Sequence, residues 1–236
     1  MSTVNVLNVG DIDLPGLPLE VFEVPQIAGM LGCFTFAAFD KRLFRNWVAG
    51  SPQAQVIGSP TASNGYATLD GNNYIETNIS ETDEMSLYVV SKDAGGVSVG
   101  IFGSYATAEP RGFAFFSLDT PLVQATAAKV LPGSGFSFTT SVAATRTAFG
   151  AYGATTGSGV GTRIRNLTTG AVATSANTDA RVVSPRTLKI GTFGGVFINP
   201  VSVMHAVAFS GRISEASFGL LLEWSRTAAA RYGVAL

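Results

Sequence analysis

The chain contains few charged residues. Asp, Glu, Lys and Arg make up 13% of its 236 residues, about half of the roughly 25% that is usual for soluble domains. Disordered chains are rich in charge and poor in apolar residues, and 46% of this chain is hydrophobic, so a largely disordered chain is excluded. The 15 basic and 16 acidic residues give a net charge of -1. The cationic excess that nucleic-acid binding requires is therefore missing.

Cysteine and histidine are also scarce. Cys33 and His205 are the single representatives of their types, so we expect no internal disulfide, no Cys/His metal site and no cofactor. The N-terminus lacks a basic segment followed by an apolar stretch, and no secretory signal is expected. No run of 18 apolar residues is present, so membrane insertion is not expected either.

Short runs of β-favouring residues follow residue 30, separated by Gly, Asn, Ser and Pro. Many short strands divided by turn signals predict a sandwich or a barrel. The lack of alternating strands and helices disfavours an open parallel sheet. The Gly/Ser/Thr-rich stretches 132–141 and 154–162 are expected to be long surface loops. The expected strands are 66–69, 74–79, 85–91, 97–102, 113–118, 123–129, 148–152, 163–167, 187–190 and 203–209.

One helix is expected near the C-terminus. Ser214 is a favourable N-cap, Glu215 opposes the helix dipole in the first turn, and Gly233 supplies a left-handed stop. We expect this helix to lie across one edge or end of the sandwich with its apolar stripe buried, so that Leu222→Ala destabilises the domain by about 2–5 kcal/mol. The stripe at helical spacing consists of Phe218, Leu221, Leu222, Ser225, Ala228, Ala229 and Tyr232.

Residues 1–30 differ from the rest of the chain. Pro15, Pro18 and Pro25 exclude a regular helix or a central strand. We therefore expect an extended N-terminal arm at 1–30 and a single domain at 31–236. The arm is expected to pack either on its own domain or on a neighbouring subunit. Its candidate assembly residues are Leu14, Leu17, Leu19 and Phe22.

Three aromatic residues are candidates for ligand binding, namely Trp47, Tyr105 and Tyr152. Large amphipathic rings exposed in a groove are suited to contact sugar rings. The alternative for each of them is a place in the hydrophobic core, and the sequence pattern does not separate the two.

The densest acidic cluster is Glu81-Thr82-Asp83-Glu84. Two carboxylates at the right separation hydrolyse glycosidic bonds, but the alternating pattern ends at Met85 and the cluster precedes a strand. We therefore expect a solvated loop edge and no enzymatic activity. As a further alternative, Glu81 and Asp83, with Asp70 or Asn72, would offer oxygen ligands to Ca²⁺.

Two other motifs are better explained by structure than by chemistry. His205 lies in the apolar run 203–209, and no Gly-x-Ser-x-Gly motif accompanies it, so we expect a strand residue satisfied by a neighbour. The stretch Gly157-Ser158-Gly159-Val160-Gly161 lacks the Lys-Ser/Thr of a phosphate-binding loop, and we expect a flexible loop.

Three stretches in order resemble the concanavalin A-like, laminin-G-type jelly-roll superfamily. They are residues 66–77 followed by the strand at 85–90, then Leu188-Lys189-Ile190-Gly191, and finally 206–215 with the helix that ends near Arg231-Tyr232-Gly233. The resemblance covers about residues 31–236 and implies an all-β, antiparallel two-sheet sandwich. The chain departs from the family at Ala216-Ser217-Phe218 and lacks a clear acidic pair for calcium, so metal-dependent sugar binding is not implied.

The low-charge texture, the arm and the stretch from Arg45 to Thr61 are similar to those of tailed-bacteriophage virion proteins. This resemblance implies a non-enzymatic structural protein on the exterior of the virion, made in the host cytoplasm. We expect a tail-associated adhesion role, with capsid decoration as the alternative. A free lectin or a polysaccharide-degrading enzyme are further alternatives. The implied partners are other virion proteins, further copies of the chain, with a trimer favoured, and a host-surface glycan.

Overall fold

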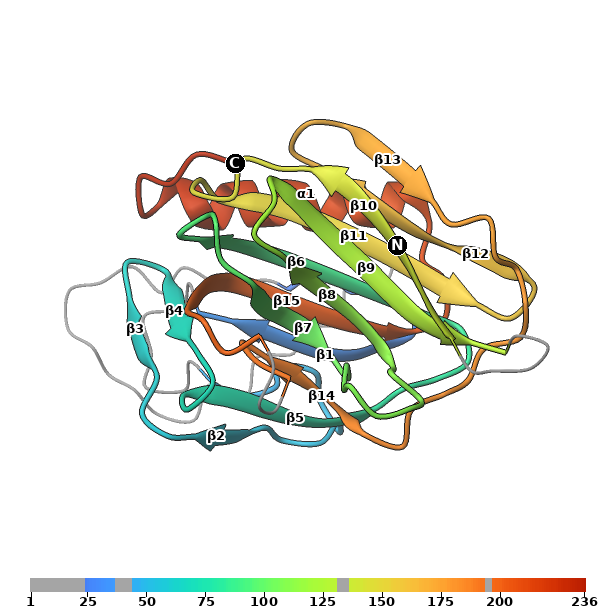
Figure 1. Cartoon of the computed structure of the whole chain (residues 1–236). Helices are drawn as coiled ribbons and strands as arrows, with labels where there is room; N and C mark the ends of the chain where they lie inside the picture. Colours follow the sequence, from blue (N-terminus) through green and yellow to red (C-terminus); the bar gives the residue numbers. More distant parts are fainter. Residues whose placement is uncertain (1–23, 37–43, 131–135, 194–196) are drawn as a thin grey trace.

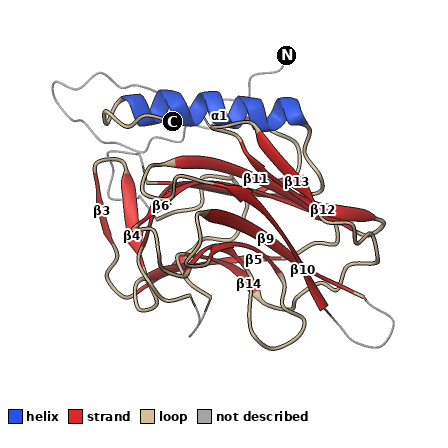
Figure 2. Cartoon of the chain, turned by 45° about the horizontal axis from the view of Figure 1, so that its top comes forward, coloured by secondary structure: helices blue, strands red, loops and turns tan. Residues whose placement is uncertain are grey.

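The described part of the chain folds into two antiparallel sheets packed face to face, with one helix outside them. The computed structural model describes residues 24–36, 44–130, 136–193 and 197–236. Figure 2 shows the three resulting layers, with the helix above one sheet and the second sheet below it. The predicted all-β jelly-roll sandwich with one C-terminal helix is confirmed.

Sheet A has the central strand β15, which pairs with β6 on one side and with β4 and β1 on the other. The pairings of this sheet are all antiparallel. Its strands, in spatial order, are β13 (Ala171–Thr174), β12 (Val160–Asn166), β11 (Gly150–Gly157), β6 (Met85–Asp93), β15 (Val201–Ser210), β4 (Tyr66–Leu69) and β3 (Thr61–Ser63), with β1 (Met30–Thr35) also on β15.

Sheet B lies in front of sheet A in Figure 1. Alternate residues of its strands point inward and form the main core with the inward residues of sheet A, as period-two strands require. Its strands, in spatial order, are β10 (Phe136–Ala143), β9 (Leu122–Lys129), β8 (Phe113–Ser117), β7 (Val99–Gly103), β14 (Thr187–Ile190), β5 (Tyr74–Ser80) and β2 (Gln55–Ile57).

Both stretches that were expected to be long loops contain strands. Residues 136–143 form β10, which pairs with β9 along its whole length. Residues 150–157 and 160–166 form the β11–β12 hairpin, whose turn at Ser158-Gly159 uses the positive φ of Gly159, 76°. The prediction of loops from composition was wrong because Gly, Ser and Thr are compatible with a strand that neighbouring strands hold in place on both sides.

Helix α1 (Glu215–Ala230) begins as predicted at Ser214, whose hydroxyl accepts a hydrogen bond from Ser217 N at 3.1 Å. Its position differs from the expectation, because it covers the outward face of sheet A and not an edge or end (Figure 2). Tyr88 of β6 anchors it, since the Tyr88 hydroxyl lies 2.7 Å from Ser225 Oγ and 3.2 Å from Leu221 O. The helix therefore belongs to a second core, on the far side of sheet A from the first.

The burial of the apolar stripe of α1 also differs from the sequence-based expectation at one position. Leu221 is fully buried, whereas Leu222 is only half-buried. We therefore predict that Leu221→Ala lowers the free energy of unfolding by about 2–5 kcal/mol and that Leu222→Ala lowers it by clearly less. Urea unfolding of the two variants checks this order, and equal losses would contradict the placement of α1.

The lateral edges of the sandwich are unlike one another. On one side β10 packs against β12 and β13, so the two sheets meet there. On the other side the outermost strands β2 and β3 have three residues each. Short edge strands limit pairing with other chains. They can therefore protect the edges of a sandwich whose surface has few charged residues to do so.

Candidate functional site

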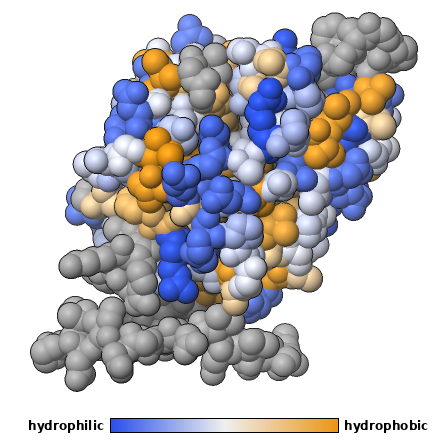
Figure 3. Space-filling model, turned by 90° about the horizontal axis from the view of Figure 1, so that it is seen from below, coloured by the Kyte–Doolittle hydropathy of each residue, from blue (hydrophilic) through white to orange (hydrophobic). Residues whose placement is uncertain are grey.

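The two outward sheet faces differ in what covers them. Helix α1 covers sheet A, and residues of β6, β15 and α1 form a shared apolar cluster there. Sheet B has no described helix on its outward face (Figure 1). An aromatic cluster lies there instead, formed by Phe116 of β8 and by three residues outside the strands, Tyr105, Phe193 and Phe197. Viewed from below, the molecule shows apolar residues in separate small patches among polar ones (Figure 3). The candidate site is the cluster on sheet B.

Four rings form this cluster, which we call the Tyr105 cluster: Tyr105, Phe116, Phe193 and Phe197. The Tyr105 ring centroid lies 5.9, 5.8 and 5.5 Å from those of Phe116, Phe193 and Phe197. Phe116 and Phe197 are stacked at 5.2 Å. Phe116 and Phe193 are buried, whereas Tyr105 and Phe197 are half-buried and reach the surface. The cluster thus offers two accessible rings on a rigid aromatic base.

Local backbone features hold the cluster in place. Gly100 of β7 leaves room for the Phe193 ring, because a Cβ at Gly100 would lie 2.8 Å from that ring. Phe197 has a left-handed backbone with φ of 55°, an unfavourable conformation for a bulky residue. Hydrogen bonds hold the segment against sheet B: Gly100 N donates to Phe197 O at 3.1 Å, and Gly71 N donates to Ile198 O at 3.0 Å. Strained residues that their surroundings hold in this way are common at functional sites.

Uncharged polar residues flank the cluster on the side of β9 and β10. The register places Gln124 opposite Phe116 and Ser141 opposite Gln124. It also places Thr126 opposite Ala114 and Thr139 opposite Thr126. The inward residues of β9 belong to the core, so Gln124 and Thr126 point outward. Polar groups and aromatic rings thus share one face.

The opposite flank carries a satisfied ion pair. Lys189 Nζ of β14 lies 3.1 Å from Glu76 Oε2 of β5 and 5.2 Å from the centroid of the Tyr74 ring. Thr187 donates a hydrogen bond to the same carboxylate. The charges on this part of the face therefore neutralise one another.

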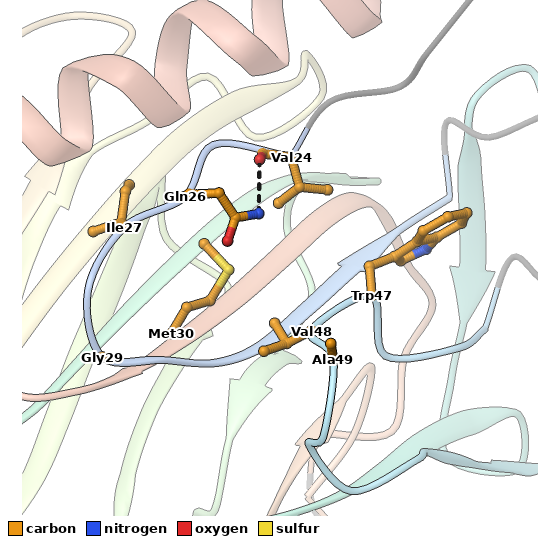
Figure 4. Close-up of a pocket in the computed structure, with 8 residues that line it drawn as sticks. All are labelled: Val24, Gln26, Ile27, Gly29, Met30, Trp47, Val48 and Ala49. Atoms are coloured by element: carbon orange, nitrogen blue, oxygen red, sulfur yellow. Dashed lines mark hydrogen bonds between the residues drawn. The ribbon is translucent and has the colours of Figure 1, made fainter. Parts of the chain in front are cut away.

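Trp47 lies in a different place, at a pocket of about 220 Å³ near the start of β1 (Figure 4). The Arg45 guanidinium lies 5.1 Å from the centroid of the Trp47 indole, and Gln26 donates a hydrogen bond to Val24 O at 3.3 Å. Within the described residues, the buried Nε1 of Trp47 has no hydrogen-bond partner. The pocket lining is Val24, Gln26, Ile27, Gly29, Met30, Trp47, Val48 and Ala49, mostly apolar.

Tyr152 is not a surface residue, which corrects the prediction of a ligand-binding role. Its side chain is 2% exposed and belongs to the main core between the sheets. Burial raises the pKa of Tyr152 to about 12, with the negative charge of Asp93 adding to the shift. The structure therefore separates the three candidates: Tyr105 is in the cluster, Trp47 is at the pocket, and Tyr152 is in the core. Leu14, Leu17, Leu19 and Phe22 of the arm lie outside the described residues.

Glu81 is not at a solvated loop edge, which corrects a second expectation. Its side chain is fully buried, with Oε2 2.9 Å from Arg181 Nη2 and accepting from Ser184 N at 2.9 Å. Its other oxygen accepts hydrogen bonds from Ser104 Oγ and Phe113 N. Asp83 remains exposed and accepts from Ser158 Oγ at 2.7 Å. Glu81 is therefore a structural carboxylate that joins three loops.

A second buried ion pair lies between Arg146 and Asp93, 2.9 Å apart. Arg146 also donates to the carbonyls of Thr120, Leu118 and Val97. Within the described residues, no group of three or more His, Cys, Asp or Glu side chains is placed to hold a metal ion. In the same part of the chain, no helix is long and apolar enough to cross a bilayer.

His205 is a buried strand residue, as the sequence predicts. It lies in β15, and its ring centroid is 4.2 Å from that of Trp224 in α1. Burial lowers the pKa of His205 to about 3. The imidazole is therefore neutral at ordinary pH and has no access to a substrate.

Sequence reasoning missed most of the cluster. Phe193 and Phe197 follow the predicted strand 187–190 in a Gly-containing stretch, and two aromatic residues in such a loop were the available signal. Nothing in the local sequence marks Gln124 or Thr139 as a site residue, because only the sheet register brings them beside Phe116 and Thr126.

No family model matches this sequence, and no curated protein matches it either. Solved structures with the same fold were found. The receptor-binding domain of botulinum neurotoxin C/D mosaic serotype has a TM-score of 0.60 and 9% identity, covering 83% of this chain and 51% of that one. A botulinum neurotoxin type C structure, from work on cell entry dependent upon two ganglioside molecules, has a TM-score of 0.59, 10% identity and coverage of 83% and 51%.

A sialidase from Trypanosoma rangeli, in complex with 2,3-difluorosialic acid, has a TM-score of 0.62 and 10% identity. The match covers 86% of this chain and 34% of the sialidase. The chain thus spans about half the length of the neurotoxin domains and a third of the sialidase. At these identities the likeness establishes the β-sandwich fold alone.

Proposed function

We propose that this chain is a non-enzymatic recognition module that binds glycans through the outward face of sheet B. The observation that carries the proposal is the Tyr105 cluster, in which the half-buried rings of Tyr105 and Phe197 lie on the outward side of sheet B, near uncharged polar side chains of β9 and β10. Rigid aromatic rings with a few placed polar groups are the usual means by which proteins hold polar ring-shaped ligands. The ganglioside and the sialic acid derivative of the neurotoxin and sialidase structures support a glycan ligand for the same fold.

The non-enzymatic part of the proposal is supported by the acidic residues. The pair Glu81 and Asp83 was the best candidate for glycosidic cleavage, but the Glu81 carboxylate is fully buried and bonded to Arg181. A general acid or nucleophile must reach the substrate bond. Glu81 has no such access, so Glu81 and Asp83 do not form the pair of carboxylates that glycosidic cleavage requires.

We further propose that the module is displayed on the exterior of a tailed-bacteriophage virion, as part of a homo-oligomer. The support is the resemblance of the low-charge sequence and the proline-rich arm to such proteins, together with the depletion of charge that buried interface cores share. Tail adhesion is favoured over capsid decoration because the glycan-binding face suits host recognition.

A glycan array tests the binding function. We predict that the wild-type protein binds one class of glycan and that Tyr105→Ala weakens binding tenfold or more, about 1.4 kcal/mol. Tyr105→Phe is the matched control, since it keeps the ring and should retain most of the affinity. Absence of binding to every glycan on the array would refute the proposed function.

Purified particles test the location. We predict that mass spectrometry detects the chain in particles, that labelled particles show it at the tail in electron microscopy, and that light scattering gives a trimer for the isolated protein. Label on the capsid would favour decoration, and absence from particles would refute both locations.

A further inference from the structure

Arg186 lies at the end of sheet B that also carries Tyr105. It directly precedes β14, and Lys189 of that strand is paired with Gly103, the last residue of β7. Because the two strands are antiparallel, the chain before Lys189 runs beside the chain that follows Gly103. The latter is the segment 104–112, which joins β7 to β8 and contains Tyr105. We call this segment the Tyr105 loop.

The protein fixes one side of the Arg186 guanidinium. Nη1 donates a hydrogen bond to Pro110 O of the Tyr105 loop at 2.9 Å and lies 3.5 Å from Ser184 Oγ. The backbone is held as well, because Arg186 N donates to Ser184 Oγ at 3.2 Å and Ser184 N donates to the buried Glu81 carboxylate at 2.9 Å. A side chain that is already held in this way loses less conformational freedom when it binds a ligand.

The other side of the guanidinium is open. Within the described residues, Nε and Nη2 of Arg186 have no hydrogen-bond partner, and neither is among the buried nitrogen atoms that lack one. The side chain is half-buried, so these two nitrogens reach solvent at its surface. Two neighbouring N–H groups of a guanidinium match two oxygens of a carboxylate or phosphate group. The open side of Arg186 therefore offers a bidentate site for such an anion.

The positive charge of Arg186 is not neutralised by the protein, since it has no ion pair with any described residue. The nearby acidic side chains are paired with other cations. Glu109 of the Tyr105 loop lies 2.9 Å from Arg111 Nε, and Glu76 lies 3.1 Å from Lys189 Nζ. At a half-buried position an unpaired cation attracts an anion more strongly than it would in bulk water.

From these observations, and resting on the proposed function, we propose that the glycan bound at the Tyr105 cluster is acidic and that Arg186 binds its anionic group. A carboxylate or phosphate group of the glycan accepts hydrogen bonds from Nε and Nη2 of Arg186. Another part of the same glycan contacts the rings of Tyr105 and Phe197. Arg186 thus selects for charge, and the rings supply the contact area.

The test uses the full-length protein on an array of carboxylated and phosphorylated glycans, each beside its neutral counterpart. Calorimetry then compares the acidic glycan that binds most tightly with its neutral form. We expect the acidic form to bind about tenfold more tightly or better, and its affinity to fall as the salt concentration rises. The two kinds of acidic glycan show which anion is bound. Equal affinity for acidic and neutral forms would overturn the inference.

Two matched variants place the anion at Arg186. Arg186→Gln and Arg226→Gln each remove one positive charge, but Arg226 lies on α1, on the other side of the sandwich, and pairs with Glu223 at 2.8 Å. We expect Arg186→Gln to weaken binding of the acidic glycan about tenfold or more while binding of the neutral form stays the same. Arg226→Gln should change neither affinity. Arg186→Lys keeps the charge without the paired nitrogens and should have an intermediate affinity for the acidic glycan.

Thermal unfolding of each variant establishes that it is folded. If Arg186→Gln bound the acidic glycan as tightly as the wild-type protein, the inference would be overturned and glycan binding at the Tyr105 cluster would stand. Equal losses for the acidic and neutral forms would also overturn it, because a purely structural role of Arg186 gives that result. A protein that binds no glycan at all would instead refute the proposed function.

Discussion

Replacing Glu81 by alanine is expected to lower the free energy of unfolding by about 3–5 kcal/mol, the usual cost of removing one member of a buried ion pair. Glu81 and Arg181 are both fully buried, and the variant leaves the Arg181 guanidinium without its counter-charge. It also removes the acceptor from Ser184 N and Phe113 N, and unsatisfied buried donors add to the loss. Urea denaturation with a constant m-value measures the change.

The matched control for this variant is Glu84→Ala, three residues further along the chain. The Glu84 side chain is exposed, so its removal should change stability by no more than about 0.5 kcal/mol. If Glu81→Ala and Glu84→Ala were equally stable, Glu81 would be a solvated loop residue and the buried network would be refuted.

The second large effect concerns acid stability. In the folded chain burial lowers the pKa of His205 to about 3, whereas in the unfolded chain it is about 6.5. Between these values the unfolded chain binds a proton that the folded chain does not, so stability falls as the pH falls, by up to about 1.4 kcal/mol per unit. The whole interval contributes about 3–5 kcal/mol. The stabilising influence of neutral His205 is present above pH 6.5 and lost toward pH 3.

His205→Phe separates this effect from the titration of carboxylates, which both proteins share. Phenylalanine keeps a flat ring against Trp224 and has no titrating group. We expect the wild-type protein to lose stability more steeply than the variant from pH 6.5 downward, as followed by urea unfolding at several pH values. If the free energies of unfolding of the wild-type protein and the variant fell in parallel down to pH 4, His205 would be protonated in the folded state.

Much of the fold was predictable because local signals coincide with tertiary packing. The strands 66–69 and 187–190 have the expected bounds, and Ser214 caps α1 as predicted. Strands β2 and β3 were missed because three residues carry no usable periodicity, and β10 because its Gly/Ser/Thr-rich approach resembles a loop. Their presence depends on neighbouring strands, which are distant in sequence.

The candidate site was predictable only at Tyr105. Aromatic residues in cores and at sites look alike in a sequence, and the burial of Tyr152 shows that periodicity did not separate them. Glu81 was misjudged for a related reason, since its partner Arg181 is 100 residues away. Buried ion pairs formed by distant residues leave no local pattern.

The position of β15 has a consequence for how the chain acquires its structure during synthesis. This last strand separates β6 from β1 and β4 in sheet A, so none of these earlier strands has its central partner until Ser210 has left the ribosome. Pairings of such high sequence separation close slowly. Sheet A is therefore completed only after β15 has been synthesised, and fragments that end before Val201 would expose unpaired strands, which favour aggregation.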